Sequence, residues 1–291
     1  MKLLVPVCPL CGHDRVRALV SKAFPGDQRL VGCTRCGLVR LLSAAPFQPD
    51  YWEDDDAGVH VYGDSTLQAE VGRRYAHYLR MIADGGGAST LLDAGCGIGN
   101  FMLAARDAGW RVAGVEVSAK AAAIARRLGL EVEISSLEDS RMPPGAFDVV
   151  TLWDIIEHVE DPIAALRAAH EKLRPGGAVF LETPNEDFWA RPLLRRAFAA
   201  TRGRIDLLSY FYYPDHRLYF TRATLTRALE TAGFQNIRVW RDVTAPTKAR
   251  LKIARGEFPC RRVVVSLIPA FLGLVGCVGA GNKLMAVATK V

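Results

Sequence analysis

The 291-residue sequence lacks a secretory signal peptide in its first residues. Met1 to Val7 contains one lysine and a short apolar run that Pro6 interrupts, which is too short for the apolar core of a signal. Acidic residues are fewer than basic ones, 31 against 37, so the formal net charge is +6. That balance permits an acidic partner without requiring one. Because the first residues do not predict a signal peptide, we expect a cytoplasmic protein.

Long uncharged runs are also nearly missing. Only residues 263–280 have no charge over 18 positions. That length would admit a marginal membrane span. Pro269, together with five glycines and alanines near the end of the run, favours a packed or interfacial helix instead. We expect at most a peripheral membrane contact there.

Cysteine is sparse, and its spacing is informative. The seven cysteines are an odd number, which favours a reducing compartment over a disulfide framework. Two Cys-x-x-Cys pairs lie 21 residues apart, each followed by a glycine, and four thiolates form a closed tetrahedral shell for a structural zinc ion. We predict a zinc ribbon over residues 1–42 with the ligands Cys8, Cys11, Cys33 and Cys36. The other three cysteines, Cys96, Cys260 and Cys277, are predicted to be plain buried thiols.

The most informative stretch is residues 91–100, which predicts a buried strand, a glycine-rich turn and the start of a helix. Glycines at alternate positions let a ligand approach the backbone N–H groups closely. Asp93 precedes the turn, and Glu116 ends the next predicted strand about twenty residues later, where a carboxylate can accept from a ribose diol. Asn100 stands where a dinucleotide fingerprint needs glycine. A carboxylate at Asp93 also suits a cationic ligand better than a phosphate.

These residues resemble the S-adenosylmethionine turn of class I methyltransferases, which reads acid-x-Gly-x-Gly-x-Gly with an acid ending the second strand. The resemblance implies an α/β fold, with a Rossmann-like seven-stranded methyltransferase sheet over residues 91–291 behind the zinc ribbon. Residues 43–90 become a helical connector or lid, in which Tyr62 and Tyr75 are candidates to cover the cofactor. A Rossmann-like turn for another ligand, or for none, is the alternative.

The resemblance also implies a set of cofactor-binding residues. Ser136 stands where the family usually has an acid, so the contact expected there comes from the backbone N–H of Leu137. The full set is Asp93, Gly95, Gly97, Gly99, Asn100, Glu116, Val117, Ser136, Leu137, Trp153 and Asp154.

Residues 147–162 predict a strand, a loop and a helix that Asp161 and Pro162 begin. They resemble the fourth motif of class I methyltransferases. Asp154, Glu157 and His158 also resemble an acid-x-x-Glu-His string of ubiquinone-pathway O-methyltransferases, where it is linked to a divalent cation. A structural use of Glu157 and His158 is the alternative reading.

Residues 186–220 predict an insertion over the substrate side. Within it, residues 188–208 carry four apolar residues near one helical face, with arginines around it: Trp189, Leu193, Leu194 and Phe198. Such a helix can lie at an anionic membrane surface. The alternative is a lid over the substrate cleft with its arginines in water.

Residues 210–221 resemble the histidine-containing signature of the methyltransferase group that includes the ubiquinone-pathway enzymes. His216 could take the proton from an attacking hydroxyl, or it could fix the loop by hydrogen bonding. His158 is the second candidate base. The last two strands, residues 237–241 and 283–290, are expected to form the antiparallel hairpin of that family.

The resemblance implies S-adenosylmethionine-dependent methyl transfer to a small-molecule, sugar or lipid-linked acceptor. One alternative is an RNA methyltransferase that uses the zinc ribbon to bind RNA. No Asn-Pro-Pro-Tyr motif follows the fourth strand, and this absence argues against a nucleic-acid partner. The other alternative is a non-catalytic zinc-ribbon binding protein with a relic cofactor site.

Overall fold

A computed structural model describes residues 7–20, 28–43, 65–83, 90–204, 208–213, 215–244, 270, 273 and 279–291. The predictions for Tyr62, Cys260, Cys277 and nearly all of residues 263–280 lie outside these ranges. Within the ranges, none of the helices combines the length and the apolar character that crossing a membrane requires.

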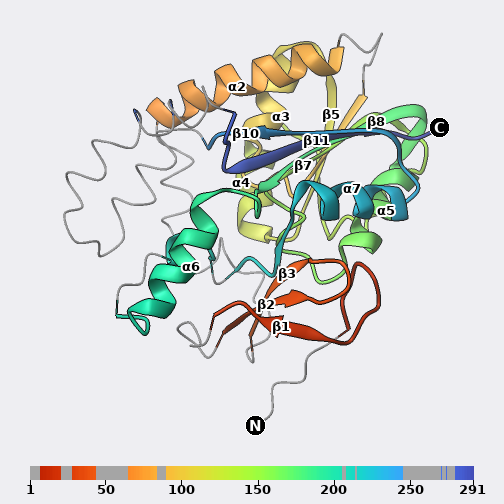
Figure 1. Ribbon diagram of the computed structural model, residues 1–291. Coiled ribbons are helices and arrows are strands. Elements are labelled where there is room, and N and C mark those ends of the chain that lie inside the picture. Colours follow the sequence, from red (N-terminus) through yellow and green to blue (C-terminus); the bar gives the residue numbers. More distant parts are fainter. Residues whose placement is uncertain are drawn as a thin grey trace.

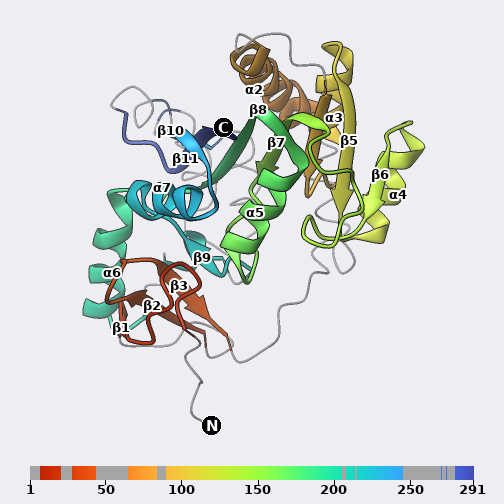
Figure 2. The ribbon, with the colours of Figure 1, turned by 90° about the vertical axis from the view of Figure 1, so that its right-hand side faces the viewer.

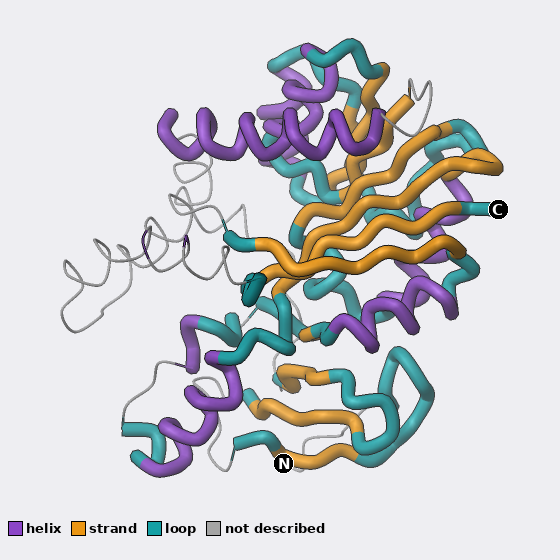
Figure 3. Tube along the Cα trace, turned by 45° about the horizontal axis from the view of Figure 1, so that its top comes forward, coloured by secondary structure: helices purple, strands orange, loops and turns teal. Residues whose placement is uncertain are grey.

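A seven-stranded sheet forms the centre of the protein (Figure 3). Strands β4 to β8 are parallel neighbours, and β11 runs antiparallel between β8 and β10. This mixed order confirms the predicted methyltransferase-type sheet, including its final hairpin. In spatial order the strands are β10 (Gln235–Asp242), β11 (Lys283–Thr289), β8 (Leu173–Pro184), β7 (Phe147–Trp153), β4 (Thr90–Ala94), β5 (Arg111–Glu116) and β6 (Val132–Ile134).

Helices cover both faces of this sheet. Successive strand residues point to opposite faces, so Phe180 of β8 packs with Leu79 and Phe101 on one face, and Leu181 packs with Leu166 on the other. In Figure 1, α2 lies above the sheet while α5 and α7 lie below it. The helices are α2 (Ser65–Ala83), α3 (Asn100–Asp107), α4 (Ala119–Arg127), α5 (Pro162–Lys172) and α7 (Arg222–Thr231).

Side-chain caps fix where three of these helices begin. Ser118 Oγ accepts from the N–H of Ala121 at 3.2 Å ahead of α4. Asp161 accepts from the first turn of α5, whose first residue is Pro162. Thr221 and Thr224 form a reciprocal capping box at α7. The sequence predicts all three caps, and the structure confirms them.

Strand β8 differs from its prediction. The sequence predicts a turn at residues 174–177 before a strand at 178–181, whereas β8 begins at Leu173 and extends to Pro184. The pairing with β7 shifts register between Phe147 and Val149, and Gly176 takes a φ of +78°. The Pro-Gly-Gly segment therefore forms an irregularity inside the strand and not its boundary.

A second, four-stranded antiparallel sheet contains the N-terminal cysteines, and we call it the ribbon sheet. Its order is β1 (Val16–Ala18), β2 (Arg29–Cys33), β3 (Val39–Leu42) and β9 (Leu218–Tyr219). Strand β9 comes from the C-terminal half, and Figure 2 shows it between α7 and the other strands of this sheet. The cysteine-containing segment is therefore joined to the rest of the chain by backbone pairing.

Helix α6 (Ala190–Ala200) lies against the ribbon sheet (Figure 1). Its residues Leu194 and Phe198 pack with the ribbon-sheet core and with the short helix η2 (Leu208–Tyr210). The expectation that its arginines lie in water is wrong for Arg191, which is buried, because an acidic partner at Glu186 compensates the charge. Trp189 and Leu193 remain exposed.

Candidate functional site

The glycine-rich turn between β4 and α3 requires its glycines. Gly95, Gly97 and Gly99 have φ values of +68°, +54° and +87°, in the left-handed region that favours glycine. A Cβ on Gly95 would lie 2.1 Å from Ile155 Cδ1, and one on Gly99 would lie 2.3 Å from Leu130 Cδ1. The predicted turn therefore exists, and it lies next to the loop after β7. Asn100 is the first residue of α3.

Glu116 is held against this turn. Its Oε2 accepts from the N–H of Gly97 at 2.7 Å, and its Oε1 accepts from the N–H of Ser118 at 2.9 Å. Burial raises the pKa of Glu116, and the N–H donors oppose that shift. A carboxylate has about four lone-pair positions, more than these N–H groups occupy, so it can also accept from a ligand. A ribose diol fits this chemistry.

Asp93 lies buried beneath the turn. The hydroxyl of Thr151 donates to Asp93 Oδ1 at 2.7 Å. Burial raises the pKa of Asp93 to about 7, the charge of Glu116 adds to the shift, and the Thr151 hydrogen bond opposes it. A cation bound nearby would favour the ionised form, so Asp93 fits a positively charged ligand.

Two buried polar atoms at the edge of this site have no hydrogen-bond partner within the described ranges, the Ser135 hydroxyl and the Trp153 indole N–H. Ser135 follows β6, where its N–H donates to the carbonyl of Glu116 at 3.1 Å. Trp153 is the last residue of β7. Because buried polar groups are nearly always paired, these two atoms fit a site that receives a polar ligand.

The other predicted cofactor residues lie around the same turn. Val117 follows Glu116 and is exposed, while Leu137 is buried. The Ser136 hydroxyl donates to Asp139 at 2.9 Å and accepts from the Asp139 N–H at 3.1 Å. The Ser136 side chain is thus used in a local turn, which agrees with the expectation that the backbone makes the contact there.

Aromatic rings from α2 and α3 surround Trp153. The Tyr78 ring stacks on Trp153 with centroids 5.3 Å apart, and Phe101 packs edge-on at 4.9 Å. Tyr75 contacts both Phe101 and Trp153. Tyr75 therefore packs over the end of β7, on the side of the sheet that α2 covers.

A partly buried group of charges lies beside these rings at the carboxyl edge of the sheet. Lys283 Nζ donates to Asp154 and lies 3.4 Å from Glu182 Oε1. Arg74 Nη2 donates to Glu182 at 2.9 Å and to Asp242 at 3.0 Å. Of this group the sequence predicts Asp154 alone, as a cofactor contact, and it misses Arg74, Glu182, Asp242 and Lys283. The start of an antiparallel last strand was the one available signal, because it places Lys283 at this edge.

A second group of side chains lies on the face of β8 opposite the Glu182 side chain, where Thr183 bonds to Glu157. Ligand atoms of Glu157, His158 and His216 all lie within 4.8 Å of one another. His158 Nδ1 lies 3.0 Å from the carbonyl of Asp215, and the His158 and His216 rings meet edge to face at 4.6 Å. A carboxylate with two imidazoles has the chemistry of a transition-metal site. Asp154 bonds to Lys283 and is not in this group, so the acid-x-x-Glu-His string is divided between two places.

The backbone also supports the loop that carries His216. The N–H groups of Arg217 and Leu218 donate to the carbonyl of Glu157 at 2.8 and 3.0 Å. Thr183 Oγ1 donates to Glu157 Oε2 at 2.9 Å, and Glu157 is fully buried. These contacts fix the loop after β7 against the strand that joins the ribbon sheet.

The four N-terminal cysteines meet at one point. Cys8 Sγ and Cys36 Sγ lie 3.6 Å apart, as do Cys11 Sγ and Cys33 Sγ, and all four sulfurs lie within 4.8 Å of one another. Four sulfurs about 2.3 Å from a zinc ion would be about 3.8 Å apart. All four are free thiols. The cluster therefore fits the predicted tetrahedral site.

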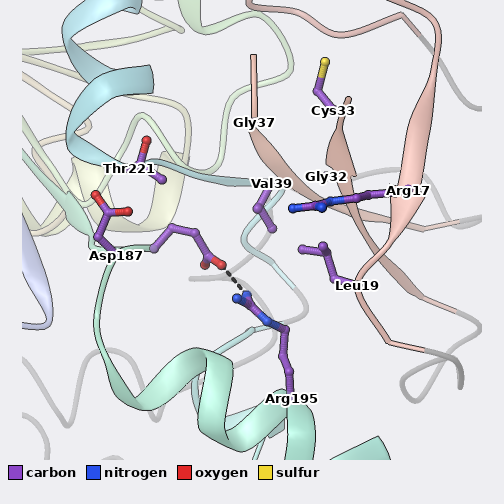
Figure 4. Close-up of a pocket in the computed structure, with 10 residues that line it drawn as sticks. Arg17, Leu19, Gly32, Cys33, Gly37, Val39, Asp187, Arg195 and Thr221 are labelled. Carbon is purple, nitrogen blue, oxygen red and sulfur yellow. Dashed lines mark hydrogen bonds and ion pairs between the residues drawn. The ribbon is translucent and has the colours of Figure 1, made fainter. Parts of the chain in front are cut away.

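A cavity of about 190 Å³ lies between the ribbon sheet and the segment before α6. In Figure 4, Arg17, Leu19 and Val39 face Asp187, Arg195 and Thr221 across it. Arg195 donates to Glu186, one of the lining residues. None of its lining residues belongs to the glycine turn, so this cavity is separate from the site described above.

Comparison with known sequences identifies similar proteins. The family described as "Methyltransferase domain" matches residues 67–239. The ubiquinone biosynthesis O-methyltransferase of Pseudomonas paraeruginosa is 38% identical over 105 residues, which cover 34% of this chain and 45% of that enzyme. The enzyme of the same name from Idiomarina loihiensis is 35% identical over 165 residues, covering 54% of this chain and 65% of that enzyme. The matched regions thus span about half to two-thirds of these relatives.

Solved structures give the same fold. A SAM-dependent methyltransferase from Archaeoglobus fulgidus superposes with a TM-score of 0.56 at 19% identity, covering 81% of this chain and 100% of that one. Phosphoethanolamine N-methyltransferase 2 of Haemonchus contortus, in complex with S-adenosyl-L-methionine, gives a TM-score of 0.54 at 17% identity, covering 87% and 62%. At such identities the likeness shows the fold alone.

Proposed function

This chain belongs to the methyltransferase domain family, and we propose that it transfers the methyl group of S-adenosylmethionine to a hydroxyl group of a small-molecule acceptor. The observation that carries the proposal is the turn itself, three left-handed glycines with Glu116 bound to the N–H of Gly97 and Asp93 buried beneath. The names of the O-methyltransferase relatives support the acceptor class. Sugar and lipid-linked hydroxyl compounds belong to the same class.

The chain contributes to the reaction by binding the cofactor and the acceptor and by orienting them. S-adenosylmethionine supplies a methyl group that its positive sulfur already activates. Glu116 would accept from the ribose hydroxyls, and Asp93 would face the positive charge. The backbone N–H of Leu137 is the proposed donor to the adenine ring. Trp153 and Asp154 would lie at the boundary between cofactor and acceptor, and the aromatic rings of α2 would exclude water there.

We also propose that Cys8, Cys11, Cys33 and Cys36 hold a structural zinc ion. Four thiolates leave no open position for substrate or water, so the metal would stabilise the ribbon sheet and take no part in the reaction. Zinc bound there would support the segment that contains β9, because β9 is the fourth strand of that sheet.

Calorimetry followed by a labelling assay tests the proposal. The zinc-loaded full chain should bind S-adenosylmethionine and S-adenosylhomocysteine. It should then transfer tritiated methyl groups to members of a panel containing 3,4-dihydroxybenzoate, nucleotide sugars, polyprenyl-linked sugars and ribosomal RNA. Failure to bind either nucleoside would overturn the proposal and favour the non-catalytic alternative. Methylation confined to RNA, with a steep salt dependence, would favour the RNA alternative.

A further inference from the structure

We propose that the Asp154–Lys283 pair accepts the proton that the acceptor hydroxyl loses during methyl transfer, in place of His158 and His216. The inference rests on the proposed function and names its base. No family motif in the sequence contains Lys283, and Asp154 was expected to contact the cofactor.

Asp154 lies beside the glycine turn. Ala94 lies opposite Leu152 in the sheet, so the glycine turn after β4 and the loop after β7 begin side by side. The contact that a Cβ on Gly95 would make with Ile155 places residue 155 directly against the turn. Asp154 lies between Trp153 and Ile155, with its N–H donating to the carbonyl of Glu182 at 3.0 Å. It is therefore next to the proposed methyl donor.

The backbone of Asp154 has a φ of +56°, which is rare for a residue with a side chain. Such conformations cluster at functional sites. Here the conformation accompanies a side chain that reaches Lys283 on the far side of β8. The pair joins residues 129 positions apart in the sequence.

Lys283 is more deeply buried than Asp154 at this edge of the sheet. The Lys283 side chain is 8% exposed, and that of Asp154 is 22% exposed. Lys283 is the first residue of β11, opposite Pro184 of β8 and Asp242 of β10. A ligand at this edge would meet the Asp154 carboxylate first, so Lys283 would act through Asp154.

Charged groups from four elements face Lys283. They are Asp154 after β7, Glu182 of β8, Asp242 of β10 and Arg74 of α2, and the hydroxyl of Tyr78 donates to Asp242. Burial and the positive charge of Arg74 lower the pKa of Lys283 to about 7. The ion pairs of Arg74 with Glu182 and Asp242 compensate those two carboxylates. The contact with the Asp154 carboxylate favours the ammonium form and opposes that shift. Lys283 can accept a proton only where the pH lies above its pKa, as a neutral amine.

The proton balance of the reaction fits this arrangement. The acceptor oxygen forms a bond to the methyl carbon, the carbon–sulfur bond breaks, and its electron pair stays on sulfur. The hydroxyl proton passes to an Asp154 oxygen, while the Asp154 carboxyl passes a proton to Lys283 Nζ, which becomes an ammonium group. One positive charge disappears from sulfur and one appears on Lys283, so the net charge of the buried site does not change.

Lys290, the residue that follows the other end of β11, provides the contrast. Its Nζ donates to the carbonyls of His170 and Leu173 at 2.8 Å each, and no carboxylate among the described residues pairs with it. That lysine joins segments of backbone. Lys290→Arg is therefore a matched control for Lys283→Arg, because each change replaces a lysine near an end of β11 with arginine.

The test measures the protonation of Lys283 and its effect on turnover in the zinc-loaded full chain. With 13Cε-labelled lysine and saturating S-adenosylhomocysteine, the resonance lost in Lys283→Arg should titrate near pH 7 and should move in Asp154→Asn. With 3,4-dihydroxybenzoate as acceptor, Lys283→Arg and Lys283→Met should both lower kcat by about 10²–10⁴-fold. The rise of kcat with pH should disappear, while affinity for S-adenosylhomocysteine and the behaviour of Lys290→Arg stay unchanged.

A Lys283 resonance that stays protonated above pH 9 overturns the proposal, and so does full activity in Lys283→Arg, because a permanently charged guanidinium cannot take the proton. A pH profile abolished by His216→Ala but kept in Lys283→Arg would return the role to the histidines. The titration decides even where 3,4-dihydroxybenzoate is not turned over. If the chain binds no S-adenosylhomocysteine, the proposed function itself fails, and calorimetry detects that separately.

Discussion

Tyr219 of β9 lies directly opposite Val39 of β3, so a strand from the C-terminal half of the chain completes the sheet that carries the cysteines. The N–H of Leu41 also donates to the carbonyl of Arg217 at 3.0 Å. His216 precedes this strand and contacts His158. The cysteine cluster and the loop after β7 are therefore mechanically connected.

Removing the proposed zinc should loosen both regions. Without metal, the four cysteines lose the ion that joins them, and the small ribbon sheet loses most of its stability. We expect one zinc per chain by elemental analysis. After chelation, hydrogen exchange should become faster in residues 28–42 and also in residues 215–220. Cys36→Ser should reproduce the effect, and Cys96→Ser should keep the zinc. Unchanged exchange at 215–220 in the zinc-free chain would contradict the connection.

Replacing Gly97 with leucine should remove cofactor binding while the fold persists. A side chain at a φ of +54° is strained, and it would occupy the space that a ligand needs near the N–H groups. Gly109→Leu is the matched control, because Gly109 has a φ of +92° and open space around its Cβ position. Both variants should lose about 1–2 kcal/mol of stability. By calorimetry, only Gly97→Leu should lose at least about tenfold in affinity, the effect of about two hydrogen bonds. Equal affinities would refute the placement of the site.

Affinity for S-adenosylmethionine should rise with pH up to about 7. In the folded chain the pKa of Asp93 is about 7, so below that pH Asp93 is protonated and must lose its proton to face a cation. The slope should approach about tenfold per pH unit. S-adenosylhomocysteine, which has one positive charge fewer, should show a smaller slope. Asp93→Asn should flatten the dependence. An affinity that falls as pH rises would exclude this role.

The ionisation of Asp93 should lower the stability of the ligand-free chain as pH rises, whereas it raises the affinity for the ligand. The pKa of Asp93 is higher in the folded chain than in the unfolded one, so the folded state binds more protons between about pH 4 and 7. Its contribution to the free energy of unfolding therefore decreases as pH rises through that window. Urea unfolding of the ligand-free chain and of Asp93→Asn should diverge there, with the variant less sensitive to pH.

Arg191 should be among the most sensitive positions for stability. Its guanidinium lies between the rings of Tyr212 and Tyr219, 4.6 and 5.0 Å from their centroids, and bonds to Glu186 at 3.2 Å. Arg191→Met leaves the buried Glu186 with less compensation and should cost about 3–5 kcal/mol in the free energy of unfolding. Arg196→Ala, on the exposed side of the same helix, should change it by less than about 0.5 kcal/mol. Similar losses in the two variants would argue against the buried network.

Local spacing made part of this protein predictable. The two Cys-x-x-Cys pairs, the glycine turn with Asp93, and the caps at Ser118, Asp161 and Thr221 each act over a few residues, so the sequence contains the whole signal. The strand order could also be expected, because the resemblance covers consecutive strands and helices. The resemblance implied the final antiparallel hairpin as well.

The sequence by itself thus determined the elements, the turn and the cysteine site, since these depend on backbone conformation and on neighbours along the chain. Only the tertiary structure decided that Lys283 meets Asp154, that Arg74 meets Glu182 and Asp242, that Arg191 is buried, and that β9 joins the ribbon sheet. These partners lie far apart in sequence, and none of their side chains is distinctive alone. They meet because sheet order and strand direction bring the ends of distant segments to one edge, where buried charges must find partners.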